Sequence, residues 1–439
     1  MAGSNPEVNR LHIGWAERVI TPPLGVELSG FAARKGVAEG VHDDLHARAL
    51  VVQGSDTAIA VLAASVLFVD QELVDGIREE VARSTGLPGD HILVAATHTH
   101  SGPKSGGEYD ASFKEECVRC LVEAWERRAP GRIGAGVTTV EDVGRNRRRL
   151  DYGGLPVDPE VGILKTEDLE GNLTGLLINY ACHPTTMGPH NLQITEDWPC
   201  YSIRRIREQV GEGVVVAYVN GAEGDINPGY GSGLSAIGAP IPIRTFAFAE
   251  KIGTRLGLAV LEALPAIATD SVVAVRTVSR RVDLPCRTTF PVSLATAESR
   301  KTATEQFLEK LPEDAPLIQQ HQAEIDVFFA GMLLNCAKRF YGDEWEPAVS
   351  VELQSIQLGD TALTSFPGEV FSQIGVAAKQ QSPFAKTFVV GVANGASGGY
   401  LPTADTYEEG DYEVVAAKYA RNAGDVLIEE TVEQLRRLE

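Results

Sequence analysis

The sequence has few basic residues for its length, and this shortage excludes a large class of functions. Lys and Arg number 39 against 60 Asp and Glu, so the 439 residues carry a formal net charge of −21. A surface of this sign repels the phosphates of nucleic acids and of anionic lipids. We therefore expect an acidic protein with no nucleic-acid partner, acting on a small molecule.

Long hydrophobic runs are also missing. No stretch approaches the roughly 20 apolar residues of a membrane span, and the N-terminal segment lacks the apolar centre of a secretory signal. Low-complexity tracts, linkers rich in Pro and Ser and internal repeats are absent as well. Because 44% of the residues are hydrophobic and 23% charged, the composition predicts a chain that is folded throughout. We expect it to be cytoplasmic and to have no stable membrane anchor.

Cysteine is scarce, and its spacing does not require a disulfide or a metal. A chain of this length does not need disulfides to stabilise its core. Cys117 and Cys120 have the spacing of a redox or zinc motif, but they lie in "SFKEECVRCLVEAWERR", where a helix places both on one buried face. We interpret them as core thiols. The other cysteines are Cys182, Cys200, Cys286 and Cys336.

Short apolar, β-branched runs alternate with amphipathic stretches, a pattern that predicts an α/β protein. We expect a layered, mostly β core with flanking helices and a site at the carboxyl ends of the strands. The expected strands are 47–53, 57–69, 91–97, 161–166, 173–182 and 214–221, and the expected helices are 71–86, 112–128, 200–211 and 244–264.

The second half of the chain predicts more strands and a helical insertion. Strands are expected near 270–290, over 349–368 and over 386–395, with a closing helix over 413–438. Residues 293–311 and 318–342 predict a helical hairpin, inserted beside the core at about 290–345. The length and the unbroken pattern favour one catalytic domain over 1–439.

Two of only nine histidines, His98 and His100, stand together in "ATHTHSGP", directly after an expected strand. Residues two apart in an extended segment point to the same face, so both imidazoles can face one cleft. Paired imidazoles suit a transition metal, although a hydrogen-bonded surface pair is the other interpretation.

Other polar residues also follow strands in loops of small residues. His183 lies in "NYACHPT", Asp225 and Asn227 in "GAEGDINP", and Glu369 in "FPGEVF". Each has a structural interpretation, such as a core histidine or a carboxylate at a helix start. Their recurrence at strand ends favours a cleft lined from several strands.

Taken in order, the motifs resemble the N-terminal catalytic domain of the neutral/alkaline non-lysosomal ceramidase family. The resemblance covers nearly the whole chain. It is carried by "GVHDDLHARALVV", "ATHTHSGP", "GRNRR", "NYACHPT", "GAEGDINP", "FPGEVF" and "GYLPTADTYEEGDYE".

The resemblance implies a catalytic zinc and a role for each site residue. In the family, a water activated by the metal attacks a carbonyl that the same metal polarises. His100 is then expected to face the substrate and this water, Tyr412 to assist at the reacting carbonyl, and Arg147 to bind the polar part of the substrate. The implied zinc ligands are His98, His183, Glu369 and Tyr400.

Two departures from the family pattern bear on the substrate. Asn227 occupies the position of a family serine; it can donate a hydrogen bond to an oxyanion but cannot act as a nucleophile. The immunoglobulin-like C-terminal domain of long family members is not expected here. We predict a zinc-dependent hydrolase of an amide or ester bond in a small polar substrate, with Asn227 and Asp225 among the catalytic residues. The alternatives are a ceramidase or N-acyl-lipid amidase, and a non-catalytic metal- or ligand-binding protein.

Several polar residues keep two interpretations. The cluster of His42, Asp43, Asp44 and His46 lines the pocket or forms a solvated turn, and we favour His42 as a substrate-binding residue. Asp70 and Asp197 each orient a ligand or cap a helix. The basic stretch "GRNRRR" is a solvated loop or an anion-binding patch.

Overall fold

A mixed eight-stranded sheet forms the centre of the computed structural model, which describes residues 10–107, 109–148, 157–395 and 399–439. Neighbouring strands are antiparallel except for the two outermost pairs, which are parallel. In spatial order the strands are β11 (Val215–Asn220), β9 (Leu173–Tyr180), β8 (Glu160–Asp168), β6 (Ala129–Thr139), β1 (His12–Val19), β3 (His46–Gln53), β4 (Ala58–Ala64) and β5 (Ile92–Ala96).

A second, four-stranded sheet packs face to face against the first. Its strands, in order, are β13 (Val275–Pro285), β14 (Ala348–Leu358), β15 (Thr361–Ser365) and β17 (Lys386–Val390). Because side chains alternate between the faces of a strand, every second residue enters the apolar layer between the sheets. Leu50, Leu177 and Val219 contribute from the large sheet, and Leu363 and Phe388 from the small one.

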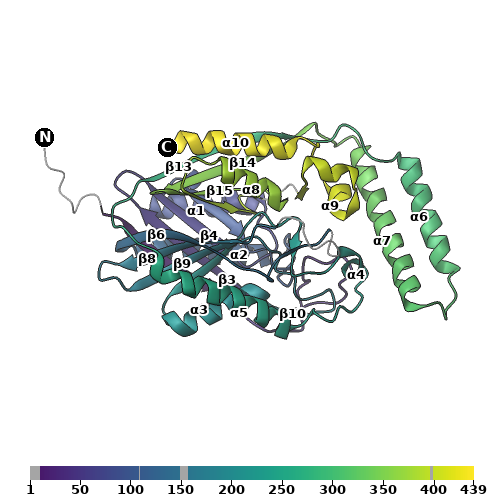
Figure 1. The fold of residues 1–439 in the computed structure, drawn as a ribbon, viewed down its shortest axis with the longest axis horizontal. Helices are drawn as coiled ribbons and strands as arrows, with labels where there is room; N and C mark the ends of the chain where they lie inside the picture. Colours follow the sequence, from purple (N-terminus) through teal and green to yellow (C-terminus); the bar gives the residue numbers. More distant parts are fainter. Residues whose placement is uncertain (1–9, 108, 149–156, 396–398) are drawn as a thin grey trace.

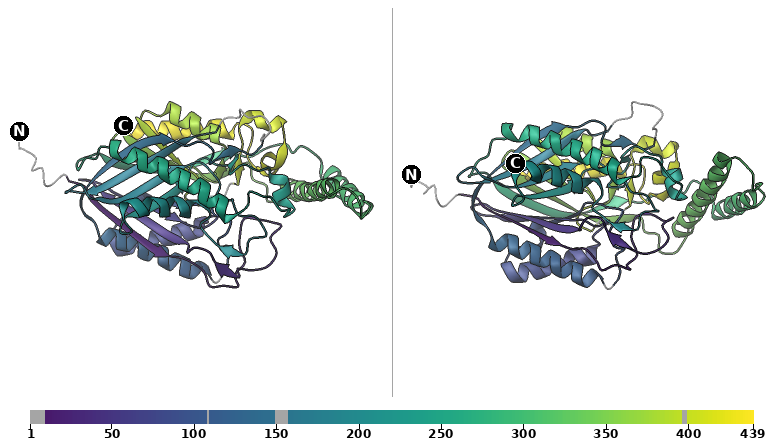
Figure 2. Two further views of the ribbon diagram at one scale, coloured as in Figure 1. Left: turned by 60° about the horizontal axis from the view of Figure 1, so that its bottom comes forward. Right: turned by 90° about the horizontal axis from the view of Figure 1, so that it is seen from below.

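Helices cover both outer faces, so the molecule has four layers (Figures 1 and 2). Helices α1 (Gln71–Thr85) and α2 (Tyr109–Glu126) pack on one half of the large sheet, and α3 (Trp198–Val210) and α5 (Phe246–Ala263) on the other. Helices α8 (Ser372–Gln381) and α10 (Ala423–Leu438) cover the small sheet. The predicted α/β class with a layered core is confirmed. No helix in the described part of the chain is long and apolar enough to cross a membrane.

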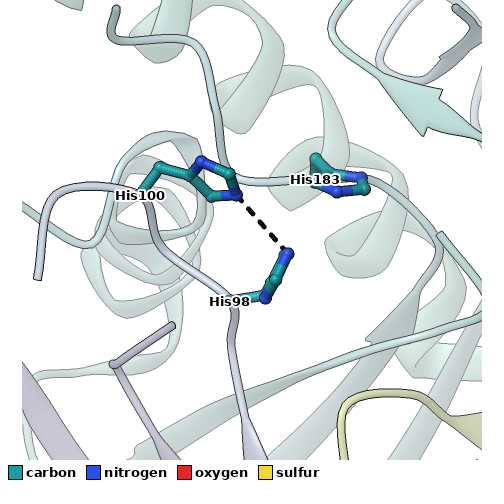
Figure 3. A group of neighbouring side chains, drawn as sticks. All are labelled: His98, His100 and His183. Carbon is teal, nitrogen blue, oxygen red and sulfur yellow. Dashed lines mark hydrogen bonds between the residues drawn. The ribbon is translucent and has the colours of Figure 1, made fainter. Parts of the chain in front are cut away.

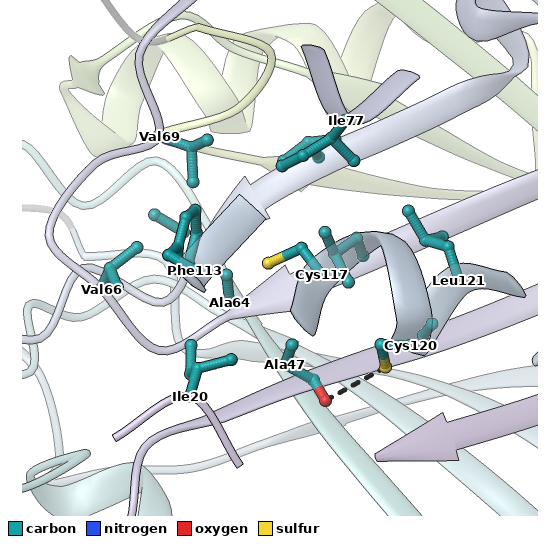
Figure 4. Packing of buried hydrophobic residues seen from close by; sticks show 14 of the residues in the cluster. Ile20, Ala47, Ala64, Val66, Val69, Ile77, Phe113, Cys117, Cys120 and Leu121 are labelled. Carbon is teal, nitrogen blue, oxygen red and sulfur yellow. Dashed lines mark hydrogen bonds between the residues drawn. The ribbon is translucent and has the colours of Figure 1, made fainter. Parts of the chain in front are cut away.

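The interpretation of Cys117 and Cys120 as core thiols is confirmed. Both side chains are fully buried between α2 and the large sheet, among Ile77, Phe113 and their neighbours (Figure 4). The Cys120 thiol lies 3.3 Å from the carbonyl oxygen of Ala47, and burial raises the pKa of both thiols. All six cysteines are free and buried.

A helical hairpin stands away from the layers. Helices α6 (Leu294–Glu309) and α7 (Leu317–Phe340) lie between β13 and β14 in the sequence (Figures 1 and 2). The two strands pair directly with each other, and the last pair is Pro285 opposite Ala348. The hairpin is therefore inserted at the end of a β-hairpin, over the stretch where the sequence predicts an insertion.

Short elements complete the chain, most of them near the ends of the strands. They are β2 (Gly40–Val41), η1 (Gly89–His91), β7 (Arg145–Asn146), β10 (Gln193–Ile194), β12 (Ile226–Asn227), α4 (Ser232–Ala236), η3 (Leu264–Ala266), β16 (Glu369–Val370), β18 (Tyr400–Leu401), η4 (Ala404–Glu408) and α9 (Asp411–Ala416).

Two expectations about the elements need correction. The sequence analysis missed the central strands β1 and β6, where glycine weakens the strand pattern. Tertiary contacts require these glycines: a Cβ on Gly14 meets the Ala124 carbonyl oxygen at 2.0 Å, and one on Gly134 meets that of Ala268 at 1.9 Å. The single closing helix is in fact two, α9 and α10, because Tyr419 between them pairs in a β-bridge.

Candidate metal centre

Three histidines converge at one end of the large sheet (Figure 3). His98 and His100 lie in the loop that leaves β5, and His183 lies in the loop that leaves β9. Their ring nitrogens lie within 4.8 Å of one another, in the arrangement that a metal site requires. The paired histidines of "ATHTHSGP" therefore face one site together with a third.

Hydrogen bonds to backbone carbonyls orient two of these rings. The Nδ1 atom of His98 donates to the carbonyl oxygen of Leu67 at 2.8 Å, and that of His183 lies 2.9 Å from the carbonyl oxygens of both Glu223 and Ile226. His98 also adopts a φ of 71°, which is uncommon for a residue with a side chain. With Nδ1 holding the proton, Nε2 of each ring presents a lone pair to the site.

A carboxylate and a phenol reach the same place through a short parallel pairing. Glu369 in β16 lies directly opposite Tyr400 in β18. One carboxylate oxygen of Glu369 is 3.0 Å from Nε2 of His183 and 3.6 Å from Nε2 of His98. The loops after β5 and β9 and the β16–β18 pair thus carry the four implied zinc ligands, and the Glu369 carboxylate lies against the rings of His98 and His183.

Burial lowers the pKa of two of the histidines, whereas the carboxylate of Glu369 stays ionised. Burial and the nearby Arg147 lower the pKa of His183 to about 4. Burial and the two neighbouring histidines lower the pKa of His100 well below its usual value. Burial acts to raise the pKa of Glu369, but the adjacent His98 and His183 outweigh it and hold the carboxyl ionised. The imidazoles of His100 and His183 are therefore neutral at neutral pH.

These donors fit a zinc ion. Zinc takes neutral imidazole nitrogen and carboxylate oxygen, and tetrahedral bonds of its usual length place ligand atoms about 3.3 Å apart. The separations of 3.0 and 3.6 Å around Glu369 bracket that spacing. His100 faces the same place, since its Nε2 lies 3.4 Å from that of His98, and its buried Nδ1 has no partner among the described residues.

A small pocket of about 90 Å³ opens beside the histidines. It shares Arg147 and Tyr412 with a larger cleft of about 870 Å³ that lies between the helical hairpin and the 407–415 segment. The lining of the small pocket brings together His100, Arg147, Asn227 and Tyr412, which were predicted to act on or bind the substrate, and the implied zinc ligand Tyr400.

Arg147 is held by a carboxylate that the sequence analysis did not single out. Its Nε donates to Glu413 at 2.8 Å and its Nη2 to the carbonyl oxygen of Gly224 at 2.8 Å. Arg148 pairs with the other oxygen of Glu413 at 3.0 Å. Arg147 is thus the basic residue of "GRNRR" that reaches the pocket. Arg149 lies outside the described residues.

Asn227 lines the pocket, but its side chain holds a turn. Its Oδ1 accepts from the backbone N–H groups of Gly229 and Tyr230, and its Nδ2 donates to the carbonyl oxygen of Tyr230. An amide carries two N–H donors, so one remains for a substrate.

The Asp225 side chain bonds to neighbouring segments of the chain and is not part of the pocket lining. Its carboxylate accepts from the backbone N–H of Ser372, at the start of α8, and from Nδ2 of Asn146, both at 2.7 Å. Burial raises its pKa to about 6. The carboxylate joins three loops around the site, so its contacts are those of a positioning residue.

The structure does not bring His42 to the histidine cluster. Its ring stacks on Phe246, with centroids 3.7 Å apart, and its Nδ1 bonds Asp43. Asp44 accepts from Thr21, and His46 lies 3.1 Å from Glu196. The expectation that His42 binds substrate in this pocket is therefore not supported by its position. The side chains of His42, Asp44 and His46 instead contact residues of neighbouring segments.

Asp197 was expected either to cap a helix or to orient a ligand residue, and its contacts serve both the helix and the loop of His183. It caps α3 by accepting from the N–H of Trp198, and it also accepts from the N–H groups of Thr186 and Met187. The carboxylate therefore holds the loop that follows His183.

Asp70 caps a helix, as one of its two interpretations expected. Its carboxylate accepts from the N–H of Leu73 at 2.9 Å in the first turn of α1. We expect Asp70→Ala to lower the free energy of unfolding by about 1 kcal/mol, the usual cost of a lost cap. Urea denaturation measures that loss, and metal analysis of the same protein checks that bound metal is unchanged. Loss of metal in this variant would instead assign Asp70 to the site.

Glu223 is a buried carboxyl that sequence reasoning passed over, although it lies inside the motif "GAEGDINP". Within the described residues both of its oxygens lack hydrogen-bond partners. Burial and the nearby Glu369 raise its pKa well above the usual value, so it holds a proton. Its position after β11 was the only signal available in the sequence.

Known proteins are similar to this chain in sequence and in fold. The family model for neutral/alkaline non-lysosomal ceramidase, N-terminal, matches residues 11–236. Neutral ceramidase of Drosophila melanogaster is 27% identical over 258 residues, which are 50% of this chain and 36% of that protein. For the Pseudomonas aeruginosa neutral ceramidase the identity is 26% over 236 residues, or 46% and 34%. The two sequence matches therefore span about a third of the length of each of these relatives.

The crystal structure of the Pseudomonas aeruginosa neutral ceramidase superposes on 98% of this chain, and the match covers 74% of the bacterial chain. The TM-score is 0.76 at 19% sequence identity. A structure described as ceramidase complexed with C2 gives a TM-score of 0.75. At this identity the likeness is one of fold.

Proposed function

This chain belongs to the neutral/alkaline non-lysosomal ceramidase family, and we propose that it is a zinc-dependent hydrolase of an amide or ester bond. The observation that carries the proposal is the convergence of His98, His183 and Glu369, with lone pairs at ligand spacing beside a pocket. Tyr400, opposite Glu369, completes the proposed ligand set.

A bound zinc supplies polarisation of the scissile carbonyl and a water that ionises near neutral pH. The chain's own residues arrange the rest. His100 stays neutral because burial lowers its pKa, so it accepts a proton from the attacking water and returns it to the leaving group. Burial raises the pKa of Tyr412 to about 12, so its phenol keeps the proton that it donates to the developing oxyanion.

Arg147 and Asn227 face the same pocket and orient the substrate in this proposal. Glu413 fixes the Arg147 guanidinium, whose carbon lies 5.3 Å from the centre of the Tyr400 ring. The free N–H of Asn227 binds a substrate oxygen. A route in which a deprotonated water attacks the carbonyl needs no hydroxyl nucleophile, so an asparagine at this position is compatible with turnover.

The pocket and the cleft favour different substrates. The 90 Å³ pocket at the histidines, with its polar and aromatic lining, supports a small polar substrate. The neighbouring cleft of 870 Å³ includes Phe329, Met332 and Leu333 of α7, which supports an N-acyl lipid as the second candidate. Apolar side chains there offer an acyl chain a surface away from water.

A series of N-acyl amides with one amine and acyl chains from acetyl to dodecanoyl tests both candidates. We expect turnover to depend on bound metal. If kcat/KM stays level along the series, the result supports the small polar substrate. A rise of about 3-fold or more per added pair of CH₂ groups indicates that the chain enters the cleft. If no amide or ester is cleaved by the zinc-loaded protein, and Asn227→Ser gains amidase activity, the non-catalytic alternative is the better description.

A further inference from the structure

Two arginines that have no carboxylate partner in the described part of the chain lie behind the pocket wall next to His100. Arg244 is only 3% exposed, and its guanidinium carbon lies 4.0 Å from the centre of the Tyr230 ring and 5.1 Å from that of Phe31. Arg34 lies 5.0 Å from the same Phe31 ring. The two cations therefore share one aromatic residue, and Phe31 and Tyr230 themselves line the pocket.

The donors of these arginines are incompletely used. Arg244 donates from Nη2 to Ser235, but its Nε and Nη1 are buried without partners among the described residues. Arg34 donates to the carbonyl oxygens of Ser29 and His100, and its buried Nε has no partner within the residues that the structure describes. Several N–H groups thus remain for a ligand that accepts hydrogen bonds.

A missing counter-ion is unusual here because the chain is so acidic. Arg48 and Arg78, which are also buried, pair with Glu196 and Glu352 at 2.7 Å. In the described part of the chain neither Arg34 nor Arg244 forms an ion pair with a carboxylate. Burial and the proximity of Arg244 lower the pKa of Arg34 to about 10, as expected for two like charges facing each other. An anion placed between them offsets that cost.

The arginines are joined to the reacting centre by direct contacts. Gly30 presses its backbone against His100, where a Cβ would lie 2.5 Å from the ring, and the Phe31 ring centre is 4.9 Å from that of His100. Arg34 donates to the His100 carbonyl oxygen at 2.7 Å. A group bound by the arginines therefore lies next to the pocket in which the amide is placed.

We propose that Arg34 and Arg244 bind an anionic group of the substrate, a carboxylate or a phosphate, and so select N-acyl amides whose amine portion is negatively charged. This inference rests on the proposed hydrolase function and names its substrate class. Planar guanidinium groups with free N–H donors match the two oxygens of either anion. Phe31 and Tyr230 hold the guanidinium groups in place by cation–π contact.

Three substrates with one acyl chain test the proposal: an N-acylethanolamine, the corresponding N-acylglycine, and the N-acylethanolamine phosphate. The wild-type protein is expected to prefer one or both anionic substrates over the alcohol, and the preferred anion distinguishes carboxylate from phosphate. Arg244→Met is expected to reduce that kcat/KM ratio by roughly 10- to 100-fold, the value of hydrogen bonds to a charged group. Arg244→Lys keeps the charge but loses the planar guanidinium group. Its kcat/KM ratio should fall between those of the wild type and Arg244→Met.

Arg287→Met is the matched control. Arg287 is 6% exposed, forms no ion pair within the described residues and lies at the base of the hairpin, so its loss should leave the ratio unchanged. Equal turnover of charged and neutral substrates by the wild type, or a preference that survives in Arg244→Met, would overturn the proposal.

Binding of a non-hydrolysable analogue separates this proposal from the proposed function. In the analogue, CH₂ replaces the amide nitrogen of the N-acylglycine, and calorimetry measures its affinity for the purified full chain. If no substrate is cleaved but the analogue binds and Arg244→Met abolishes that binding, the anion site stands without the hydrolase. If substrates are cleaved but Arg244→Met and Arg287→Met bind the analogue equally well, the hydrolase stands without the anion site.

Discussion

Replacing His183 by Ala is expected to remove the bound metal and to lower kcat/KM by about 1,000-fold or more. The ring supplies one of the converging lone pairs, and the other histidine of the loop after β9, His190, is not part of the cluster. Losing the metal removes both carbonyl polarisation and the activated water, and a 1,000-fold change corresponds to about 4 kcal/mol of transition-state stabilisation. Metal content per chain and turnover of the best amide in the series measure the two effects.

His91→Ala is the matched control for this variant. The Nδ1 atom of His91 lies 2.9 Å from the Ala58 carbonyl oxygen, so it makes the same kind of backbone contact away from the site. We expect it to keep both metal and activity. Glu369→Gln gives a second test, since it preserves shape and removes the ligand charge. Unchanged metal and turnover in His183→Ala would show that the assigned centre is wrong.

The largest loss of stability is expected from breaking the buried ion pair beneath the site. Both side chains of the pair are 3% exposed, and the Arg48 guanidinium lies 2.7 Å from the Glu196 carboxylate. Ser65 and His46 also contact that carboxylate. Arg48→Met leaves Glu196 without its cation, and the free energy of unfolding should fall by about 3–5 kcal/mol. Denaturant unfolding measures this loss.

The deficit of Arg48→Met should depend on pH. In the wild type, burial alone would raise the pKa of Glu196, but Arg48 and His46 outweigh it and hold the pKa far below its usual value. The stability that this carboxylate contributes is therefore present above its unfolded pKa and is lost only in strong acid. Without Arg48 the buried carboxyl takes up a proton more readily. The difference between variant and wild type is thus expected to be largest at neutral pH and to shrink on acidification.

Two further variants control this experiment. Adding Glu196→Leu to Arg48→Met removes the unpaired charge and should recover much of the stability. Lys104→Ala breaks an exposed pair with Glu27, at 3.0 Å, and should cost less than about 1 kcal/mol. If Arg48→Met costs no more than Lys104→Ala, the buried pair is not a major source of stability.

The sequence by itself determined the class of fold and pointed to two of the histidines that converge in the proposed metal centre. Apolar periodicity is local, so it located α1, α3, α5 and the helical hairpin to within a few residues. His98 and His183 were identifiable because each directly follows a strongly apolar strand. The burial of both Cys117 and Cys120 also followed from helical spacing.

Only the tertiary structure decided which side chains complete the site. The pairing that sets Glu369 opposite Tyr400 joins segments far apart in the chain, and two-residue strands leave no periodic signal. The same holds for Glu413 on Arg147, and for Arg34 and Arg244, which lie over the same Phe31 ring and have no carboxylate partner among the described residues. The physical reason is that local patterns report burial and backbone preference, whereas charge pairing depends on which loops the folded layers bring together.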